Sequence, residues 1–269
     1  MALTQLIVLA VLQSLADVFP IGADGHTALV SVLLHWPAPD SALRLALRIG
    51  LLLGVMAYFW RDLADMVMGV IRAAKGKRNA DAGLALQIAV AAIPTLGLGF
   101  AFEYYLAGDW QTLHVAAWAI VGGALLLLFC DRMSMTVKRV EHATYADSIV
   151  VGLGQVIALV PGIGSAAMSI TLARLLGFER GHAVRLSALL SIPVSAAVIA
   201  RDAYTLFTVD RAGISNLNIL CGVAAFFAAL IGLAILMGWL RRATFTPFVV
   251  VRLVLGLAVL ALAYEWVTV

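Results

Sequence analysis

Charge is scarce in this sequence. Only 12% of its 269 residues are charged, whereas 63% are hydrophobic, and the mean hydropathy is +1.03. Soluble globular domains carry about 25% charged residues, so this composition excludes an ordinary soluble enzyme and predicts a polytopic membrane protein. The formal net charge of +3 arises from basic residues at the ends of apolar runs, which indicates membrane topology and not nucleic-acid binding.

Cysteine is equally scarce. Cys130 and Cys221 are the only two, and each lies in an apolar stretch. A disulfide framework or a thiolate metal site needs more cysteines, so neither is expected and both residues are predicted to be inert core thiols. No basic side chain precedes the first apolar run, and we therefore expect no cleavable signal peptide.

Long apolar runs are abundant. A helix that crosses a bilayer needs about 20 mostly apolar residues, and six stretches meet this requirement. They are residues 43–60, 84–102, 113–129, 183–200, 219–240 and 248–267. Two further apolar regions, 2–34 and 147–176, are interrupted by proline and glycine. We predict that both are re-entrant helical hairpins, because irregular backbone at membrane depth needs protein or a wet cavity around it.

The two interrupted regions begin halves of the chain that resemble each other. QSLADVFPIG at 13–22 resembles QVIALVPGIG at 155–164, and Pro20 and Pro161 lie 141 positions apart. The dipeptide Arg-Asp at 61–62 recurs at 201–202, an offset of 140. We predict a single, all-α integral membrane domain over 1–269, with repeat 1 at about 1–131 and repeat 2 at about 147–269. Three spans per repeat would turn the second one upside down, which makes an inverted repeat.

Loop charges predict the orientation of the spans. Basic residues follow the first, third and fifth spans, at 61–78, 132–139 and 241–242, and so place these loops in the cytoplasm. The segment 103–112 carries acidic residues and no basic ones, which suits the outside. The first hairpin then enters from outside and the second from the cytoplasm, so that their breaks meet near the midplane.

Polar residues at the first break are typical of an ion or phosphate site. Gln13 and Asp17 are four apart and share one helix face, while Asp24 and His26 lie at the break and just past it. A carboxylate at the bilayer centre costs about 2.5–3.5 kcal/mol, so it usually has a polar partner. We predict a divalent metal on Asp17 and Asp24, beside a phosphate. The alternatives are that both carboxylates cap helix ends and that His26 is structural.

The second break is glycine-rich. The segment PGIGSAAMSIT at 161–171 places Gly162 and Gly164 before Ser165. Glycine allows backbone amides to approach an anion closely, so we predict phosphate binding at these three residues. Small residues in membrane helices also serve tight helix packing, which is the alternative.

These segments resemble the bacterial undecaprenyl pyrophosphate phosphatases of the non-PAP2 type, also called the bacitracin-resistance protein family. The family motif E-G-x-x-E-F-x-P-[VI]-S-S-x-x-H corresponds to QSLADVFPIGADGH, and P-G-x-S-R-S-G corresponds to PGIGSAA. The segments IPTLGLGFAFE, LLGFERGHAVRLSALLSIPV and FTPFVVVRLVLG are also similar to family segments, so the resemblance covers nearly the whole chain.

The resemblance implies a fold and an activity. The expected fold has six transmembrane helices and two re-entrant hairpins in the bacterial inner membrane, with a pocket that opens to the periplasm. The expected reaction removes the terminal phosphate from the C55 isoprenoid diphosphate, the lipid carrier of peptidoglycan and cell-envelope synthesis. A divalent cation, Mg²⁺ or Ca²⁺, is the expected cofactor.

The chain departs from both family motifs where the chemistry lies. The replaced positions are Gln13 and Asp17 for two glutamates, Gly22 and Ala23 for two serines, Gly164 for a serine, Ser165 for the arginine, Ala166 for a serine and Ala167 for a glycine. Substitutes are available within the chain. Asp24 could supply a second metal carboxylate, and Ser165 or His26 could act as nucleophile or general base.

Arg48 is the candidate that replaces the lost arginine. It lies inside the first span, four residues after Arg44, and a buried arginine suggests an anionic partner such as the substrate phosphate. The alternatives are that it pairs with Asp17 or Asp24, or that its guanidinium reaches the headgroup region. Arg174 is a weaker substitute.

Two functions stay open from the sequence. The first is a metal-dependent polyprenyl diphosphate phosphatase with a rearranged site. The second is an inactive family member that binds or translocates a lipid phosphate, which suits an inverted repeat with broken helices; hydrolysis of another lipid phosphate is a third option. The expected partners are the lipid bilayer and a polyprenyl diphosphate or phosphate, without nucleic acid, and a homodimer is compatible with all three.

Overall fold

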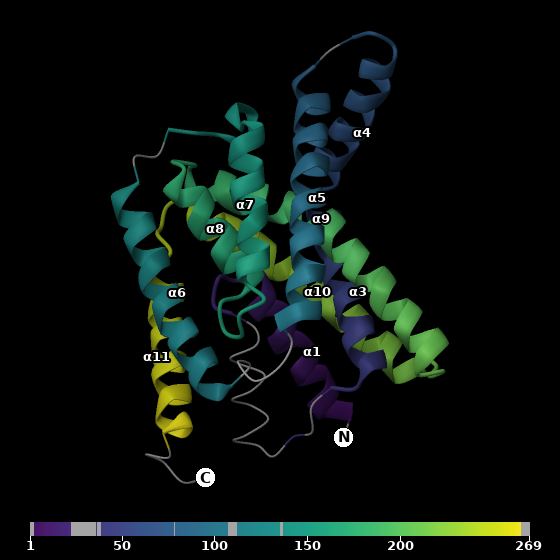
Figure 1. Ribbon diagram of the computed structural model, residues 1–269, viewed down its shortest axis with the longest axis vertical. Helices are drawn as coiled ribbons and strands as arrows, with labels where there is room; N and C mark the ends of the chain where they lie inside the picture. Colours follow the sequence, from purple (N-terminus) through teal and green to yellow (C-terminus); the bar gives the residue numbers. More distant parts are fainter. Residues whose placement is uncertain are drawn as a thin grey trace.

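The computed structural model of the chain describes residues 3–22, 36, 39–77, 79–106, 112–134 and 137–264 (Figure 1). These residues form helices and connecting turns, and the only β pairing among them is an isolated bridge between Lys138 and Phe178. The α-helices are α1 (Leu3–Val18), α3 (Ser41–Tyr58), α4 (Trp60–Ala74), α5 (Ala80–Leu106), α6 (Leu113–Met133), α7 (Tyr145–Ile157), α8 (Ser165–Leu175), α9 (Arg180–Tyr204), α10 (Asn216–Leu240) and α11 (Thr246–Ala263). A 3₁₀ turn, η1 (Val140–His142), precedes α7, and a π turn, η2 (Thr205–Val209), extends α9.

Six of these helices are long and apolar enough to cross a membrane, which confirms the predicted number of spans. They are α3, α5, α6, α9 with η2, α10 and α11. Two of them contain an internal proline, Pro94 in α5 and Pro193 in α9, yet neither helix ends there. Prolines are tolerated inside membrane helices because neighbouring helices and local adjustments satisfy the released backbone groups.

Close helix packing holds the spans together. A β-carbon at Gly50 of α3 would collide with the carbonyl oxygen of Gly222 in α10, so the backbones of these two helices are in direct contact. A β-carbon at Gly256 of α11 would come within 2.7 Å of Val121 in α6, and α6 and α11 lie side by side in Figure 1. Small residues at such contacts allow dispersion forces to act between helices that share an apolar solvent.

The second interrupted region is a helical hairpin. The helices α7 and α8 are joined by a turn at 158–164, in which Gly162 and Gly164 have φ of +90° and +76°. Residues other than glycine rarely adopt such angles, so these glycines allow the chain to reverse. In the first interrupted region α1 ends at Val18 and Gly22 also has a positive φ, +80°. The remainder of that predicted hairpin, 23–35, lies outside the described residues.

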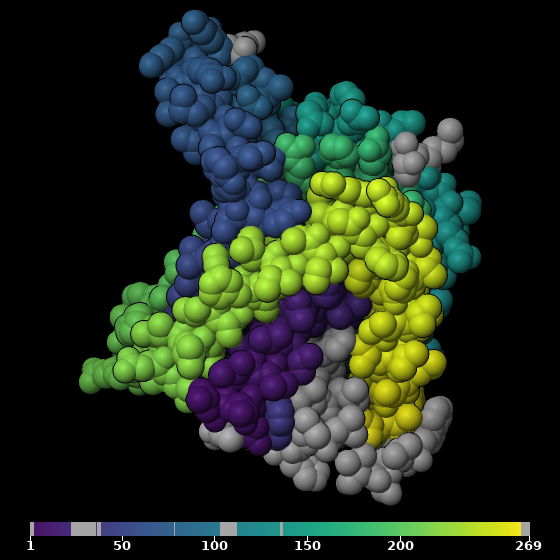
Figure 2. Space-filling view, turned by 180° about the vertical axis from the view of Figure 1, so that it is seen from behind, coloured from purple at the N-terminus to yellow at the C-terminus, as the bar shows by residue number. Residues whose placement is uncertain are grey.

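The segment after the first span is a helix, whereas the sequence was interpreted there as a charged cytoplasmic loop. Helix α4 and the beginning of α5 stand out from the body of the molecule as an arm, visible in blue in Figures 1 and 2. Gly69 allows α4 to pack closely against α5. A β-carbon at this position would lie only 2.7 Å from the backbone nitrogen of Ala82. Val67 and Ile71, on the opposite face, are exposed.

Candidate functional site

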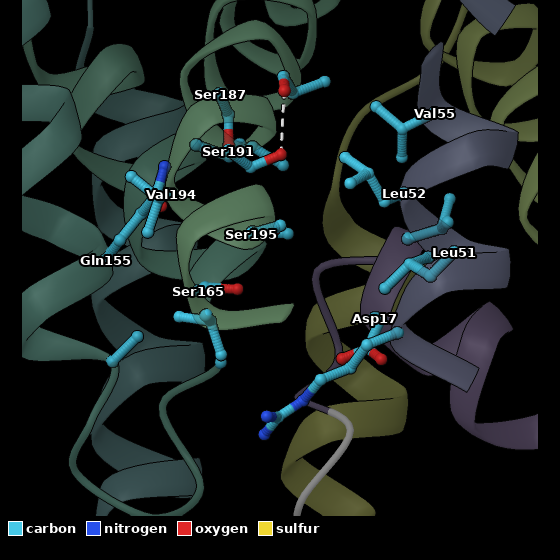
Figure 3. A pocket seen from close by; sticks show the side chains of 18 of the residues that line it. Asp17, Leu51, Leu52, Val55, Gln155, Ser165, Ser187, Ser191, Val194 and Ser195 are labelled. Carbon is cyan, nitrogen blue, oxygen red and sulfur yellow. Dashed lines mark hydrogen bonds between the residues drawn. The ribbon is translucent and has the colours of Figure 1, made fainter. Parts of the chain in front are cut away.

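A cavity of about 350 Å³ lies between helices from the two halves of the chain. Helices α1 and α3 form one wall, and α7, α8 and α9 form the other (Figure 3). Leu51, Leu52 and Val55 of α3 face the column of serines on α9 across this space. Both walls combine polar and apolar side chains, so the cavity suits an amphipathic ligand.

Two predicted residues of the first break line the cavity. Gln13 and Asp17 are one turn apart on α1, and the spacing that predicted a shared face is thereby confirmed. Asp17 is the only carboxylate among the described residues that line the cavity. The other two predicted residues of this break, Asp24 and His26, lie outside the described residues, so their placement stays a prediction.

The second break supplies hydrogen-bond donors. Gly164 and Ser165 line the cavity at the N-terminus of α8. Gly164 is the N-cap residue and no side chain of the described residues caps this end, so within that part of the chain the first amides of α8 are available to a ligand. An uncapped helix N-terminus carries a partial positive charge and favours anions. Gly162 does not line the cavity; its carbonyl instead accepts a hydrogen bond from Arg252 at 3.0 Å.

Gln155 contributes an unsatisfied donor. Its side chain lines the cavity from α7, and its Nε2 atom is buried without a hydrogen-bond partner in the described part of the chain. A buried amide that lacks a partner costs about 1–3 kcal/mol, so such groups usually mark a place where a ligand or water binds. Gln155 is the counterpart of Gln13 in the sequence repeat, and the structure brings both to one cavity.

Three serines on α9 were missed by the sequence interpretation. Ser187, Ser191 and Ser195 are spaced at i, i+4 and i+8 and all line the cavity (Figure 3). The Ser191 hydroxyl donates to the carbonyl of Ala188 at 2.7 Å and keeps its lone pairs available. Their spacing within a predicted membrane span was the signal, because polar residues that repeat on one helix face line an interior surface.

The two breaks contact each other. A β-carbon at Gly164 would lie 3.0 Å from the Cα of Gly22, and a β-carbon at Gly22 would lie 3.1 Å from the carbonyl oxygen of Gly162. The backbone of the first break therefore touches the turn that precedes α8. The two motifs, whose prolines lie 141 positions apart in the sequence, therefore meet in the structure.

The predicted phosphate-binding arginine is at the cavity but has a protein partner. Arg48 lines the cavity and forms an ion pair with Asp202 of α9, whereas Asp24, one of the predicted partners, lies outside the described residues. The pair is partly accessible, with 45% of the Arg48 side chain and 20% of the Asp202 side chain exposed. A phosphate that enters the cavity would compete with Asp202 for this guanidinium.

Arg174, the weaker substitute, serves another purpose. It is fully buried, its Nε lies 2.9 Å from Asp131 Oδ1, and it donates to the carbonyls of Phe178 and Asp131 at 2.5 and 2.9 Å. These contacts tie α8 to the end of α6 and to the start of α9. Arg174 is not among the described residues that line the cavity.

A second ion-pair group lies at the other end of α9. Arg185 donates to Asp62 of α4 at 2.6 Å and to Glu141 of η1 at 2.7 Å. Burial raises the pKa of the Glu141 carboxyl, but a backbone hydrogen bond and the Arg185 guanidinium outweigh this effect and hold the pKa below its usual value. These contacts join α4, η1 and α9 on the side of the predicted cytoplasmic loops.

The predicted divalent cation can be tested against the oxygen atoms of the cavity. Asp17, Gln13 and Ser165 offer a carboxylate, an amide carbonyl and a hydroxyl. Mg²⁺ and Ca²⁺ take oxygen ligands, and Mg²⁺ is commonly held by one or two carboxylates together with substrate phosphates. The described residues contain no group of three or more His, Cys, Asp or Glu side chains that could hold a metal by themselves. The cavity therefore fits a cation that is shared with a bound phosphate.

Comparison with known proteins places the chain in a family. The profile of the family described as bacitracin resistance protein BacA matches residues 6–258. The chain belongs to the BacA family. A relative in Rhodospirillum rubrum, named undecaprenyl-diphosphatase 1, is 40% identical over 272 residues, which cover 98% of this chain and 96% of the relative.

Further relatives of this BacA-family chain carry similar names. Undecaprenyl-diphosphatase 1 of Paramagnetospirillum magneticum is 37% identical over 268 residues, 98% of each chain. Undecaprenyl-diphosphatase of Roseobacter denitrificans is 34% identical over 272 residues, which cover 98% of this chain and 100% of the relative. The family predicted from the motifs is confirmed, and the whole length of the chain takes part in the similarity.

Proposed function

We propose that this multi-pass membrane protein is an undecaprenyl diphosphate phosphatase that removes the terminal phosphate from the polyprenyl diphosphate carrier of cell-envelope synthesis. The names of its relatives support this activity. The observation that carries the proposal is the cavity in which Asp17 of α1 and Ser165 at the start of α8 line one space between the two halves of the chain. A carboxylate and an uncapped helix N-terminus together suit a metal-associated diphosphate.

The diphosphate would bind beside the polar side chains of the cavity. The amides at the start of α8, the Gln155 side-chain amide and the Ser165 hydroxyl are donors without charge, and Arg48 adds a cation at the cavity wall. In phosphoryl transfer the protein acts mainly by positioning the phosphates and by stabilising their charge. The leucine and valine side chains of α3 offer an apolar surface to the beginning of the isoprenoid chain.

Asp17, with Gln13 and Ser165, would hold the divalent cation. Mg²⁺ or Ca²⁺ bound there would neutralise part of the negative charge of the diphosphate. The predicted second carboxylate is Asp24, and His26 or Ser165 is the predicted nucleophile or general base. With His26 or Ser165 as general base, water attacks the terminal phosphorus and gives its proton to that base; the bond to the bridging oxygen breaks, inorganic phosphate forms, and the lipid monophosphate leaves with the bridging oxygen. With either residue as nucleophile, the phosphoryl group is transferred to it first, and water then releases it as inorganic phosphate.

The location follows from the predicted topology. We place the protein in the bacterial inner membrane, with the pocket opening to the periplasm and the basic segments 61–78, 132–139 and 241–242 in the cytoplasm. The inverted repeat, at about 1–131 and 147–269, and a homodimer belong to the same proposal.

Phosphate release from a polyprenyl diphosphate tests the activity. Purified protein in detergent is assayed with Mg²⁺, with Ca²⁺ and with a chelator, beside His26→Ala and Asp17→Asn. The matched control is Asp65→Asn, because Asp65 is an exposed carboxylate on α4, outside the cavity. We expect metal-dependent release that both cavity variants reduce by at least about 10³-fold, a range typical of lost charge stabilisation in phosphoryl transfer. Equal rates in Asp17→Asn and Asp65→Asn would disprove the assigned site.

A second function is favoured by the partners of the arginines. Arg48 and Arg174, the two substitutes for the motif arginine, both form ion pairs with protein carboxylates. A protein that binds or translocates the lipid phosphate without cleaving it would need no catalytic clamp. Saturable binding of the lipid without phosphate release, under all metal conditions, would select this function.

A further inference from the structure

Arg252 is a buried arginine whose hydrogen bonds go to backbone carbonyls. It lies on α11 with 1% of its surface exposed, and its Nε donates to the carbonyl of Ile120 at 3.1 Å. Its Nη2 donates to the carbonyls of Gly162 and Ile163 at 3.0 and 2.6 Å. Within the described ranges no carboxylate forms an ion pair with it. The guanidinium therefore retains a positive charge that no neighbouring group in the described part of the chain neutralises.

Helix α6 leaves space for this side chain. A β-carbon at Gly123 would collide with Nη2 of Arg252, so the absence of a side chain at Gly123 is required for the observed position of the guanidinium. A buried cation without an anionic partner is unfavourable unless hydrogen bonds or a bound anion compensate it. Helices α6 and α11 thus bury the Arg252 guanidinium even though removing its charge from water is unfavourable.

The carbonyls that Arg252 binds belong to the turn of the second break. Gly162 and Ile163 precede Gly164 and Ser165, which line the cavity at the start of α8. Since Arg252 holds the two carbonyls toward α11, those oxygens are withheld from an anion in the cavity. The same hydrogen bonds fix the turn that carries the uncapped amides of α8.

We propose that Arg252 is a positioning residue for anion binding. It fixes the turn at 162–163 so that the first amides of α8 face the cavity, and its unneutralised charge attracts a phosphate group that it does not contact. The inference rests on the proposed function, because it assumes that the cavity receives the phosphates of the lipid. Under this inference the phosphate site depends on a residue of α11 that does not line the cavity, in addition to the residues that do.

Binding of inorganic pyrophosphate tests this role without requiring hydrolysis. Wild-type protein in nanodiscs is titrated with pyrophosphate by calorimetry, beside Arg252→Lys, Arg252→Met and Gly123→Ala. Arg72→Met is the matched control, because Arg72 is an exposed arginine on α4. Thermal unfolding of each variant shows whether it is folded.

We expect pyrophosphate affinity to fall at least tenfold in Arg252→Met and by a smaller factor in Arg252→Lys, which keeps the charge but loses the planar fork of donors. A merely structural role would lower the unfolding temperature of both variants and leave the affinity of the folded protein unchanged, which would overturn the inference. Should Arg252→Met fail to fold, Gly123→Ala decides, since it displaces the guanidinium without changing any residue of the turn or of the cavity.

The same titration separates this inference from the proposed activity. Wild-type protein that binds pyrophosphate but releases no phosphate from the lipid would disprove the hydrolase and leave the role of Arg252 standing. Wild-type protein that binds no pyrophosphate but releases phosphate from the lipid would overturn the role of Arg252 and leave the hydrolase standing.

Discussion

Arg185 donates from Nε to Asp62 Oδ1 at 2.6 Å and thereby ties the first turns of α9 to α4. At the other end of α9, Asp202 accepts from Arg48 of α3. Helix α9 supplies the arginine of the first ion pair and the aspartate of the second. Residues of α3 and α9 that lie between the two pairs line the cavity. Asp62 and Asp202 are also the residues that the 140-position offset of the sequence relates to each other.

The Arg185 pair should contribute measurable coupling. Asp62 and Arg185 are partly buried, with 16% and 27% of their side chains exposed. We expect a double-mutant cycle of Asp62→Asn and Arg185→Gln to give a coupling energy on the order of 1 kcal/mol, because hydrogen bonds between charged groups exceed those of exposed ion pairs. Thermal unfolding in detergent measures it. Additive effects of the two substitutions would show that the pair is energetically irrelevant.

Gly50→Ala should destabilise the contact between α3 and α10. A methyl group at Gly50 meets the carbonyl of Gly222, whereas one at Gly97 of α5 has no atom within 4 Å among the described residues. Alanine is about 0.5–1 kcal/mol better than glycine inside a helix, so Gly97→Ala should raise stability. Gly50→Ala should lower it by about 1–3 kcal/mol, as overpacking does. Melting curves of the two variants that shift in the same direction would contradict the observed packing.

Gln155→Met should raise the free energy of unfolding and weaken the binding of pyrophosphate. It replaces a buried donor that lacks a partner with an apolar side chain of similar size, so the free energy of unfolding should rise by on the order of 1 kcal/mol. Pyrophosphate binding should weaken, because the cavity loses a donor. Gln87→Met is the control of opposite sign, since the Gln87 amide donates to the carbonyl of Ala143 at 2.9 Å. A loss of stability in Gln155→Met would show that its amide has a partner.

Glu141 should make the junction of η1 and α9 sensitive to acid. Its folded pKa lies below the unfolded value of about 4.3, so its contribution is complete above that pH and is lost as the pH falls through the folded pKa. We expect hydrogen exchange in 137–144 to increase below about pH 4 in the wild type. Glu141→Gln should show the faster exchange at neutral pH as well. Identical exchange in both proteins at pH 7 would argue against the Arg185 contact.

Composition and apolar run lengths were sufficient to predict the six spans, because the bilayer imposes both the length and the polarity of each helix. The same criteria missed α4. Its charged residues matched a cytoplasmic loop, and its exposed apolar residues, such as Val67 and Ile71, became recognisable only once α5 was seen to cover the other face.

The roles of the predicted site residues stay predictions, but their common location in the structure could be anticipated in part. Asp17, Gln13, Gly164 and Ser165 could be chosen because polar residues and helix breaks are rare in membrane segments, and the structure brings them together. Partner choice was not predictable, since Arg48 could have paired with several carboxylates and pairs with Asp202, 154 positions away. Asp24 and His26 stay predictions.

The contact between Gly22 and Gly164 has an evolutionary consequence. Each occupies a position where the family motif has a serine, each has a positive φ, and a β-carbon at Gly164 would lie 3.0 Å from the Cα of Gly22. A side chain is therefore disfavoured at both positions: a β-carbon at Gly164 meets the Cα of Gly22, one at Gly22 meets the carbonyl oxygen of Gly162, and each backbone has a positive φ. A return to the family serine at either position would therefore require the backbone of that break to adopt a different conformation.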